Sequence, residues 1–551
     1  MNQKLPSRDF IGLYRDSFVE NWNLPMFSDY GGSDYQYGEV VQIIHRIHLF
    51  FNKCGIQKGD KIALLGRNSS NWGISFLATI SYGAVSIPIL PDFNPADLHH
   101  IVNHSESKLL FAADLLFEKT EVNKMPQLQA VISLLNFDLL FDQDNTNINA
   151  WEQSLKPGVV SNITPDEFDL PELKDEALCI ISYTSGTSGF TKGVMLPIRS
   201  LLSNIIYARE HMPLKSGDEI VSFLPMAHAF GLLFEFLFPA TVGCHITFLT
   251  KSPTPQIIIK AFKEIRPRLI LSVPLVIEKI YKKQILPTLE KPLIRVLMKV
   301  PGISSILQKK VKEKLVETFG GRFHEIVIGG APLSKDVEEF FRKIGFPFTI
   351  GYGMTECGPL ISYDAWNITE PGSAGKLVDR MQVRIDSSDP YRKVGEIQVK
   401  GINVMMGYYK NEEATNQAIS SDGWLNTGDL GLIDSKNYIY IKGRCKNMLL
   451  GPSGQNIYPE EIEAKLSNLP CILETVVIDR DDKLVALVFP DPEMVDAHKL
   501  DEESLMKLME HNKQLVNREL PKYSKIGVIE LVEKEFEKTP KRNIRRYLYT
   551  K

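Results

Sequence analysis

Short apolar runs alternate with helical patterns through about the first 440 residues of the chain. The runs are rich in β-branched side chains, and they include "KIALLG" (61–66), "EIVSFLP" (219–225), "HITFL" (245–249), "RLILSVP" (268–274) and "HEIVIGG" (324–330). Strands that alternate with helices predict α/β layers with largely parallel sheets. We therefore predict an α/β fold whose large, multi-layered N-terminal domain has β-sheets flanked by helices.

The pattern changes beyond residue 443. There, "ETVVIDR" (474–480) and "LVALVFP" (484–490) are typical of strands, and a helix with an acidic first turn precedes them. About a hundred residues of this α+β character suit a second, smaller domain. We predict an N-terminal domain at 1–443 and a C-terminal domain at 444–551.

One apolar segment is long enough to cross a membrane. Residues 72–90 carry no charge and have about the length that a bilayer requires. However, Gly83 interrupts the segment, and "AVSIPIL" after it has the pattern of a short strand. We expect a helix followed by a buried strand. The first ten residues lack the apolar stretch of a secretory signal.

Charge and cysteine content narrow the class of protein. The 551 residues include 63 Lys and Arg against 67 Asp and Glu, so the overall charge does not favour nucleic acid as a partner. The six cysteines are scattered without close pairs, which argues against a disulfide framework and a zinc site. A reducing cytoplasm is the expected location.

The segment "YTSGTSGFTKGVML" (183–196) has the residues of a phosphate-binding loop. Small residues let backbone amides and hydroxyls approach an anion, and Lys192 adds a positive charge. It does not have the spacing of a Walker loop, and a flexible turn is the alternative interpretation. The small residues that would hold the phosphates are Ser185, Gly186, Thr187, Ser188 and Gly189.

Six further motifs follow in order along the chain: "LPMAHAFG" (224–231), "GGAPLS" (329–334), "GYGMTECGP" (351–359), "GWLNTGDLG" (423–431), "GRCKNM" (443–448) and "GQNIYPEEIE" (454–463). With the loop, this ordered set resembles the adenylate-forming superfamily of acyl-CoA synthetases, peptide-synthetase adenylation domains and luciferases. The resemblance spans nearly the whole chain. The amino acids within the motifs are most similar to those of the long-chain fatty acyl-CoA synthetase branch.

The resemblance implies a two-step ligase. The enzyme would join a fatty acid to the α-phosphate of ATP with release of pyrophosphate, and coenzyme A would then displace AMP. The loop with Lys192 would hold the β and γ phosphates, and Thr184 and Glu356 would bind Mg²⁺ with them. As an alternative, Thr355 and Glu356 only begin a helix.

The resemblance also implies a nucleotide site. Adenine would lie in a slot between the backbone that follows "IGG" and the face of Tyr352. Asp429 would accept hydrogen bonds from the ribose, with Arg444 beside it, unless Asp429 is a turn residue between two strands. The remaining nucleotide contacts would come from Gly330, Ala331, Pro332, Gly353, Met354 and Thr355.

Three further roles follow from the resemblance. His228 would lie near the fatty acid carboxylate and the path of the thiol, although a lone histidine among apolar residues is usually a core residue. A mobile C-terminal domain would pivot at Lys446 between the two half-reactions. Gly454 would border a channel for pantetheine; an ordinary hinge and a turn glycine are the alternatives.

One position departs from the family pattern. The family's C-terminal lysine, which contacts the acyl carboxylate and the α-phosphate, is replaced here by Asn543 in "EKTPKRNIRRYLYTK" (537–551). Lys541, Arg542 and Arg545 are neighbours that could substitute, and we favour Lys541. If none does, the protein is a slow enzyme or an inactive nucleotide- or acyl-adenylate-binding homologue.

The expected partners are small molecules: a fatty acid, ATP and coenzyme A. A carrier protein acting in trans is an alternative acyl acceptor, because the chain shows no fused carrier domain. Lysines interspersed with apolar residues at 279–317 would suit peripheral contact with the inner face of a membrane, unless the apolar side packs on its own domain.

Overall fold

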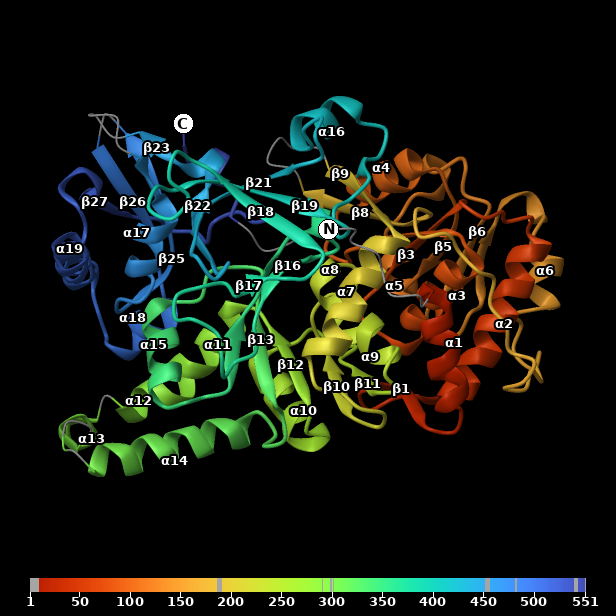
Figure 1. Ribbon diagram of the computed structural model, residues 1–551, viewed down its shortest axis with the longest axis horizontal. Helices are drawn as coiled ribbons and strands as arrows, with labels where there is room; N and C mark the ends of the chain where they lie inside the picture. The colour runs from red at the N-terminus through yellow and green to blue at the C-terminus, as the bar shows by residue number, and fades with distance from the viewer. Residues whose placement is uncertain are drawn as a thin grey trace.

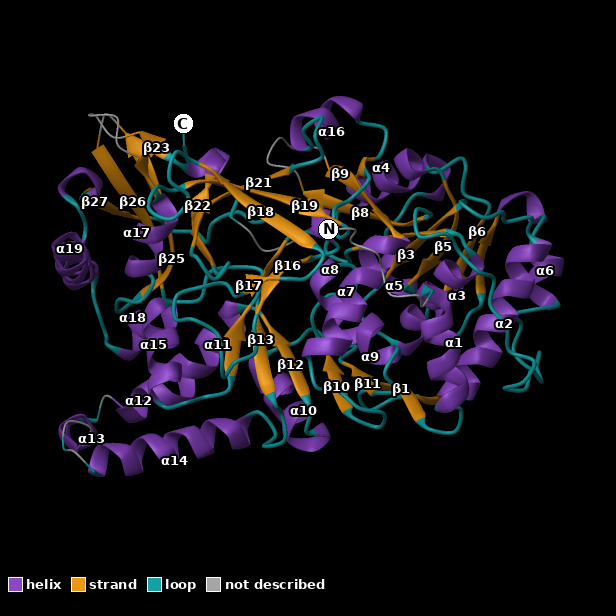
Figure 2. Cartoon of the chain, viewed as in Figure 1, coloured by secondary structure: helices purple, strands orange, loops and turns teal. Residues whose placement is uncertain are grey.

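The computed structural model describes residues 9–185, 191–289, 291–297, 300, 302–450, 456–480, 483–539 and 544–550. Figure 1 shows an elongated molecule, with the N-terminal helices and strands at one end and the C-terminal sheet at the other. In Figure 2, helices cover sheets in several layers. The predicted α/β architecture, with a smaller C-terminal α+β part, is confirmed.

An eight-stranded sheet forms one side of the large part, in the order β20-β9-β8-β4-β3-β5-β6-β7. Its first five strands in sequence, through β7, precede a hairpin that carries the phosphate-loop sequence. The strands are β3 (Lys61–Leu65), β4 (Val85–Ile89), β5 (Ser107–Ala112), β6 (Ala130–Ser133), β7 (Leu139–Asp142), β8 (Leu178–Ser185), β9 (Thr191–Pro197) and β20 (Gly407–Tyr408). Strands β3, β4, β5, β6 and β8 are parallel.

The apolar segment at 72–90 forms a helix and a strand of this sheet, as predicted. Helix α3 (Ser70–Tyr82) is buried from Ser70 to Ser81, and it ends at Gly83, whose φ of 87° is left-handed. Strand β4 follows at once and is buried throughout. Among the described residues, no helix is long and apolar enough to cross a membrane.

Two further sheets use the other predicted runs. One has the order β10-β11-β1-β2, and the other has the order β12-β13-β14. Their strands are β1 (Pro25–Asp29), β2 (Asp34–Gln36), β10 (Glu219–Ser222), β11 (His245–Phe248), β12 (Leu269–Ser272), β13 (Glu325–Ile328) and β14 (Phe348–Ile350). All pairs but β1·β2 are parallel.

Helices cover these sheets, and their apolar sides join the main core, except that the helix at 95–105 packs in a second cluster of buried residues. Serine, asparagine and threonine caps begin several of them; for example, Ser69 accepts a hydrogen bond from the amide of Trp72. The longer helices are α1 (Phe10–Glu20), α2 (Tyr37–Lys53), α4 (Pro95–Ser105), α7 (Ile198–His211), α10 (Pro255–Ile265), α11 (Pro274–Ile280), α14 (Ile303–Thr318) and α15 (Lys335–Lys343).

Two antiparallel sheets connect the large part to the C-terminal part. One contains β15 (Tyr352–Gly353), β16 (Leu360–Tyr363) and β17 (Lys376–Leu377). The other contains β18 (Met381–Asp386), β19 (Gly395–Gly401), β21 (Leu425–Ile433) and β22 (Ile439–Arg444). Both lie between the two ends of the molecule in Figure 1.

The C-terminal part has its own core. Strands β25 (Ile472–Arg480), β26 (Lys483–Pro490) and β27 (Ile526–Leu531) form a sheet, which packs with α17 (Pro459–Leu466) and α19 (Glu502–Glu519). The two predicted strands are β25 and β26. Lys282 Nζ donates to the carbonyl of Ser467 at 3.0 Å, so the two parts touch. The boundary at Arg444 stays a prediction.

The six cysteines form no disulfide, as their scattered positions predict. All six cysteines are free thiols, and four of them are buried. Burial raises the pKa of the Cys179 thiol to about 12 and that of Cys54 to about 12 as well. These thiols stay protonated at neutral pH and behave as small apolar side chains.

Candidate active site

Thr184 and Lys192 face each other across the hairpin that carries the phosphate-loop sequence. They are paired residues of the antiparallel strands β8 and β9. The Thr184 hydroxyl approaches the carbonyl of Lys192 at 3.5 Å, a long hydrogen bond. Ser185 ends β8, whereas Gly186, Thr187, Ser188 and Gly189 lie outside the described residues. The hairpin thus presents a hydroxyl and an ammonium group on the two flanks of the loop.

Tyr408 connects Lys192 to Glu356. The Lys192 ammonium lies 4.8 Å from the centre of the Tyr408 ring, which is a cation–π contact. The Tyr408 hydroxyl donates to Glu356 Oε1 at 2.9 Å. Burial, followed by the Glu356 charge, raises the pKa of Tyr408, so this hydroxyl keeps its proton. One aromatic side chain therefore fixes both predicted phosphate-site charges.

No motif in the sequence points to Tyr408. It reaches the site because β20 pairs with β9, placing Tyr408 opposite Val194. The amide of Tyr409 also donates to the carbonyl of Gly193 at 2.7 Å. Pairing between strands so distant in sequence has no local signal in composition or spacing.

Glu356 lies in a single 3-10 turn, η5 (Thr355–Cys357). Strand β16 follows this turn, so the helical geometry ends after one turn. The alternative that Thr355 and Glu356 begin a longer helix is therefore wrong. The amide of Met405 donates to the Glu356 carbonyl at 2.8 Å, which anchors the turn to the segment that leads into β20. On the other side of the turn, Gly353 allows the close approach of Pro359, because a Cβ added to Gly353 would lie 2.2 Å from the Pro359 carbonyl oxygen.

Asp429 is held from two sides. Tyr352 donates to Asp429 Oδ2 at 2.7 Å, and Arg444 Nε lies 2.9 Å from Oδ1. Asp429 and Arg444 are directly paired residues of β21 and β22, so Asp429 is not a turn residue. Burial raises the pKa of Asp429, and the Arg444 charge opposes that shift. The carboxylate is therefore oriented by a phenol and a guanidinium.

The segment Gly330, Ala331 and Pro332 follows strand β13 and is exposed. Gly330 has a left-handed φ of 85°, which a larger residue adopts only with strain. The amide of Gly351 donates to the Ile328 carbonyl at 2.9 Å, so this segment and Tyr352 leave neighbouring parallel strands at the same edge. Ligands of open α/β sheets bind at that edge.

His228 caps a short helix, α8 (Ala229–Gly231). Its Nδ1 accepts from the amide of Phe230 at 3.3 Å, and its side chain is partly buried. Close by, Glu235 is completely buried in a π-helical turn (Leu232–Leu237), and its Oε2 accepts from the amides of Phe223 and Leu224, each at 2.9 Å. Glu235 could not be predicted as a functional residue, because a single acidic residue in an apolar run does not indicate that its side chain accepts hydrogen bonds from backbone amides.

Several C-terminal predictions fall on residues that the structure does not describe. Gly454, Lys541, Arg542 and Asn543 lie outside the described residues. Lys446 lies in a 3-10 turn (Cys445–Asn447) directly after β22. The backbone amide of Arg545 donates to the Glu537 carbonyl at 2.8 Å.

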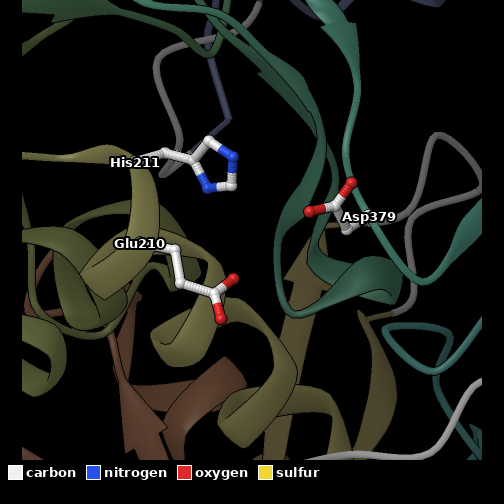
Figure 3. Close-up of side chains that lie close together, drawn as sticks. All are labelled: Glu210, His211 and Asp379. Atoms are coloured by element: carbon white, nitrogen blue, oxygen red, sulfur yellow. The ribbon is translucent and has the colours of Figure 1, made fainter.

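Within the described residues, one group of three potential metal ligands lies together, and it does not include Glu356. Glu210 and His211 at the end of α7 face Asp379 from the β17–β18 connection, with ligand atoms within 4.8 Å of one another (Figure 3). All three are exposed, and Arg380 supplies a guanidinium 3.9 Å from Glu210. We assign no metal to them. Glu356 and Thr184 stay the predicted Mg²⁺ ligands, and a carboxylate and a hydroxyl are the hard oxygen ligands that Mg²⁺ prefers.

Comparison with known families gives two matches along the chain. Residues 19–409 match the family described as AMP-binding enzyme. Residues 447–551 match the AMP-binding enzyme C-terminal domain. Together the two matches cover most of the chain.

Curated relatives resemble the chain over most of its length. It is 28% identical to the long-chain-fatty-acid–CoA ligase FadD15 of Mycobacterium bovis, over 85% of this chain and 79% of that protein. It is 27% identical to the long-chain-fatty-acid–CoA ligase heimdall of Drosophila melanogaster, over 86% and 74%. It is 28% identical to the long-chain-fatty-acid–CoA ligase 1 of Saccharomyces cerevisiae, over 78% and 68%.

Solved structures share the fold at lower identity. The anthranilate CoA ligase AuaEII in complex with anthranoyl-AMP has a TM-score of 0.78 at 18% identity, covering 99% of this chain and 97% of that one. The o-succinylbenzoate CoA synthetase MenE of Bacillus subtilis with ATP and magnesium ion has a TM-score of 0.73 at 18% identity, covering 97% and 98%. At these identities the likeness concerns the fold.

Proposed function

Because this chain belongs to the AMP-binding enzyme family, we propose that it activates a long-chain fatty acid with ATP and then transfers the acyl group to coenzyme A. The curated relatives bear long-chain-fatty-acid–CoA ligase names. The observation in the structure that carries the proposal is the row Lys192, Tyr408 and Glu356, which sets a cation and a carboxylate beside the phosphate-loop sequence.

The first half-reaction joins two anions. A carboxylate oxygen of the fatty acid attacks the α-phosphorus of ATP, the bond from that phosphorus to the bridging oxygen breaks, and pyrophosphate leaves. In the second half-reaction, the sulfur of coenzyme A attacks the acyl carbon, the thiol loses its proton, and AMP leaves. Each step needs fixed positive charge where the phosphate charge develops.

Lys192 supplies part of that charge. Its ammonium is held by the Tyr408 ring at 4.8 Å, so it is oriented before the substrate binds. With the loop residues 185–189, it would hold the leaving pyrophosphate. Glu356 and Thr184 would hold Mg²⁺, which would neutralise phosphate charge when it is bound.

Asp429 would bind the ribose hydroxyls. Tyr352 and Arg444 fix its carboxylate through bonds of 2.7 and 2.9 Å. The adenine would lie between the ring of Tyr352 and the exposed backbone of Gly330, Ala331 and Pro332, with Gly353, Met354 and Thr355 lining the same place. His228 would stand at the acyl carboxylate.

The C-terminal part would move between the two half-reactions. We propose the division at 1–443 and 444–551, with the pivot at Lys446 and the pantetheine channel beside Gly454. The contacts between the two parts in this structure include the Lys282–Ser467 bond. Such a small polar contact would break at little cost when the domain rotates.

Coenzyme A is the proposed acceptor, and a carrier protein in trans is the alternative. Free thiols throughout the chain suit the cytoplasm, and we place the enzyme there. An inactive binding homologue is disfavoured, because the carboxylate, the lysine and the ribose-site aspartate each have a specific partner that orients them.

A pyrophosphate-release assay tests this function. Purified protein is given Mg²⁺ and ATP with fatty acids of graded chain length, with and without coenzyme A, and the nucleotide product is identified. We expect release that depends on a long-chain acid, AMP as product, and acyl-CoA only when coenzyme A is present. Formation of ADP and phosphate would overturn the adenylation mechanism.

Asn543 requires a separate test. Loss of one charge-assisted hydrogen bond slows adenylation by about ten- to a hundredfold unless a neighbour replaces the lysine. We propose that Lys541 replaces it, so Lys541→Ala should abolish pyrophosphate release and Asn543→Lys should change it little. Acceleration by Asn543→Lys, with no effect of Lys541→Ala, would show instead that the position is empty.

A further inference from the structure

Helix α14 extends beyond the body of the protein. Its C-terminal end packs on the main core through Leu315, with Val311 and Val316 beside it. Toward the N-terminal end, Ile303 and Ile306 are exposed, and Figure 1 shows the helix reaching along the outside of the molecule to α13 (Pro292–Leu297). The helix is therefore anchored at one end and projects at the other.

Exposed aliphatic side chains gather at the projecting end. Val296 and Ile306 are 63% and 60% exposed, and Val300 and Ile303 are exposed as well. We call these four residues the α14 tip. Hydrogen bonds from the Ser304 amide to the Val300 carbonyl, and from the Ile306 amide to the Gly302 carbonyl, hold the turn before the helix against it. A cluster of exposed aliphatic residues on a projecting element marks a surface that binds a partner.

The segment that carries the tip is strongly basic. Residues 279–317 contain ten Lys and Arg against three Asp and Glu, a net charge of +7, although the whole chain has a net charge of −4. Within α14, Lys309 and Lys310 are exposed and lie within one or two turns of Ile306. Neither forms an ion pair with the described residues. Their charges are available to an anionic partner.

We propose that the α14 tip and the lysines behind it dock the protein on an anionic lipid bilayer. Aliphatic side chains entering the headgroup region, together with a basic cluster facing lipid phosphates, are the two signals that produce stable peripheral binding. A nucleic acid fits less well, because residues 291–318 contain no aromatic side chain on which bases would stack. A second copy of the chain would place like charges together.

The proposal goes beyond the ligase activity and does not depend on it. Binding to vesicles is measured without ATP or an acid, so its failure is separate from failure of the proposed function. If both hold, the tip would bring the enzyme to the surface in which long-chain fatty acids dissolve.

Vesicle sedimentation with the full-length protein tests the docking surface. One set of vesicles contains phosphatidylcholine only, and the other contains phosphatidylcholine with phosphatidylglycerol, each at low and high salt. We expect binding to the anionic vesicles at low salt and much less at high salt, since salt screens exposed charges. No binding to anionic vesicles at low salt would overturn the proposal.

Two paired variants locate the surface. Lys309→Gln with Lys310→Gln should weaken binding about tenfold or more, because each basic residue near an anionic surface contributes about fivefold in affinity. Ile303→Ser with Ile306→Ser should also weaken it. The matched controls are Lys119→Gln with Lys174→Gln, which removes two exposed charges elsewhere, and Leu135→Ser, which removes an aliphatic residue that is 74% exposed.

The controls and a competing ligand decide the result. Equal losses in the control variants would overturn the assignment to α14, because the effect would then follow from charge or apolar content in general. Tighter binding of the protein to polyuridylate than to anionic vesicles, lost in the Lys309→Gln, Lys310→Gln variant, would overturn the lipid assignment. Pyrophosphate release in detergent solution should be unchanged in the tip variants, which shows that they are folded.

Discussion

Replacing Glu235 by leucine should destabilise the protein more than replacing it by glutamine. Glu235 is fully buried, and its Oε2 accepts the amides of Phe223 and Leu224. Its Oε1 has no hydrogen-bond partner within the described part of the chain. Burial raises the pKa of Glu235 well above its usual range, with the two amides opposing the shift. Burial therefore favours the protonated, neutral form of this side chain.

The size of the effect follows from this geometry. Leucine fills a similar volume but leaves two buried amides without an acceptor, and each such group costs about 1–3 kcal/mol. Glu235→Leu should therefore cost about 2–6 kcal/mol. Glutamine keeps an acceptor oxygen for both amides but places its NH2 group where Oε1 has no partner, so Glu235→Gln should cost less than Glu235→Leu, about 1–3 kcal/mol.

Urea unfolding followed by fluorescence measures the difference between the variants. Hydrogen exchange at the Phe223 and Leu224 amides gives a local measurement that does not require two-state unfolding. Glu20→Leu, on the exposed end of α1, is the control and should change stability by about 0.5 kcal/mol or less. A glutamine variant as unstable as the leucine variant, or unprotected amides in the wild type, would refute the reasoning.

Three further predictions concern the site and the core. Lys192→Ala and Glu356→Gln should each lower pyrophosphate release about one hundred- to thousandfold with unchanged circular dichroism, and near wild-type rates would contradict their proposed roles. Tyr408→Phe keeps the cation–π contact and loses only the hydroxyl bond to the carboxylate, so it should lower the rate of pyrophosphate release about tenfold and raise the Mg²⁺ concentration that the reaction requires. Tyr408→Leu also loses the ring and should lower that rate several-fold more. Equal rates in the two variants would mean that the ring does not orient the lysine. Burial raises the pKa of Glu325 to about 7, so its contribution to stability is present below about pH 4.5 and is lost as the pH rises through 7. Between pH 4.5 and 7, the free energy of unfolding of Glu325→Gln, measured in urea, should therefore rise by up to about 3 kcal/mol relative to that of the wild type. A difference between the two proteins that does not change with pH would contradict the raised pKa of Glu325.

Much of the fold could be predicted because its strands are short, buried and separated by helices. Runs such as 61–66 and 324–330 became β3 and β13, since a strand buried on both faces is apolar along its length. The segment 72–90 was also interpretable, because Gly83 supplies the left-handed residue that ends α3. These features are local, and a sequence records local features directly.

Residues of the site could be predicted only where they belong to a recognisable sequence motif. The resemblance identified Lys192, Glu356 and Asp429, yet it gave no indication that Asp429 lies inside a strand with Arg444 as its direct neighbour. Tyr408 was missed because its role arises from a pairing of distant strands. Contacts of that kind depend on topology, which neither periodicity nor composition encodes.

The short pairing of β20 with β9 also affects how the protein folds as it is synthesised. Strand β9 ends at residue 197, and its outer neighbour is supplied only when residues 407–408 have been made. At about 5–20 residues per second, roughly 10–40 seconds pass between the two events, and β9 is an open sheet edge for that time. Open edges recruit other chains, so nascent chains that stall before residue 407 should aggregate more readily than those that stall beyond it. Closing this edge and completing the phosphate site are thus one event.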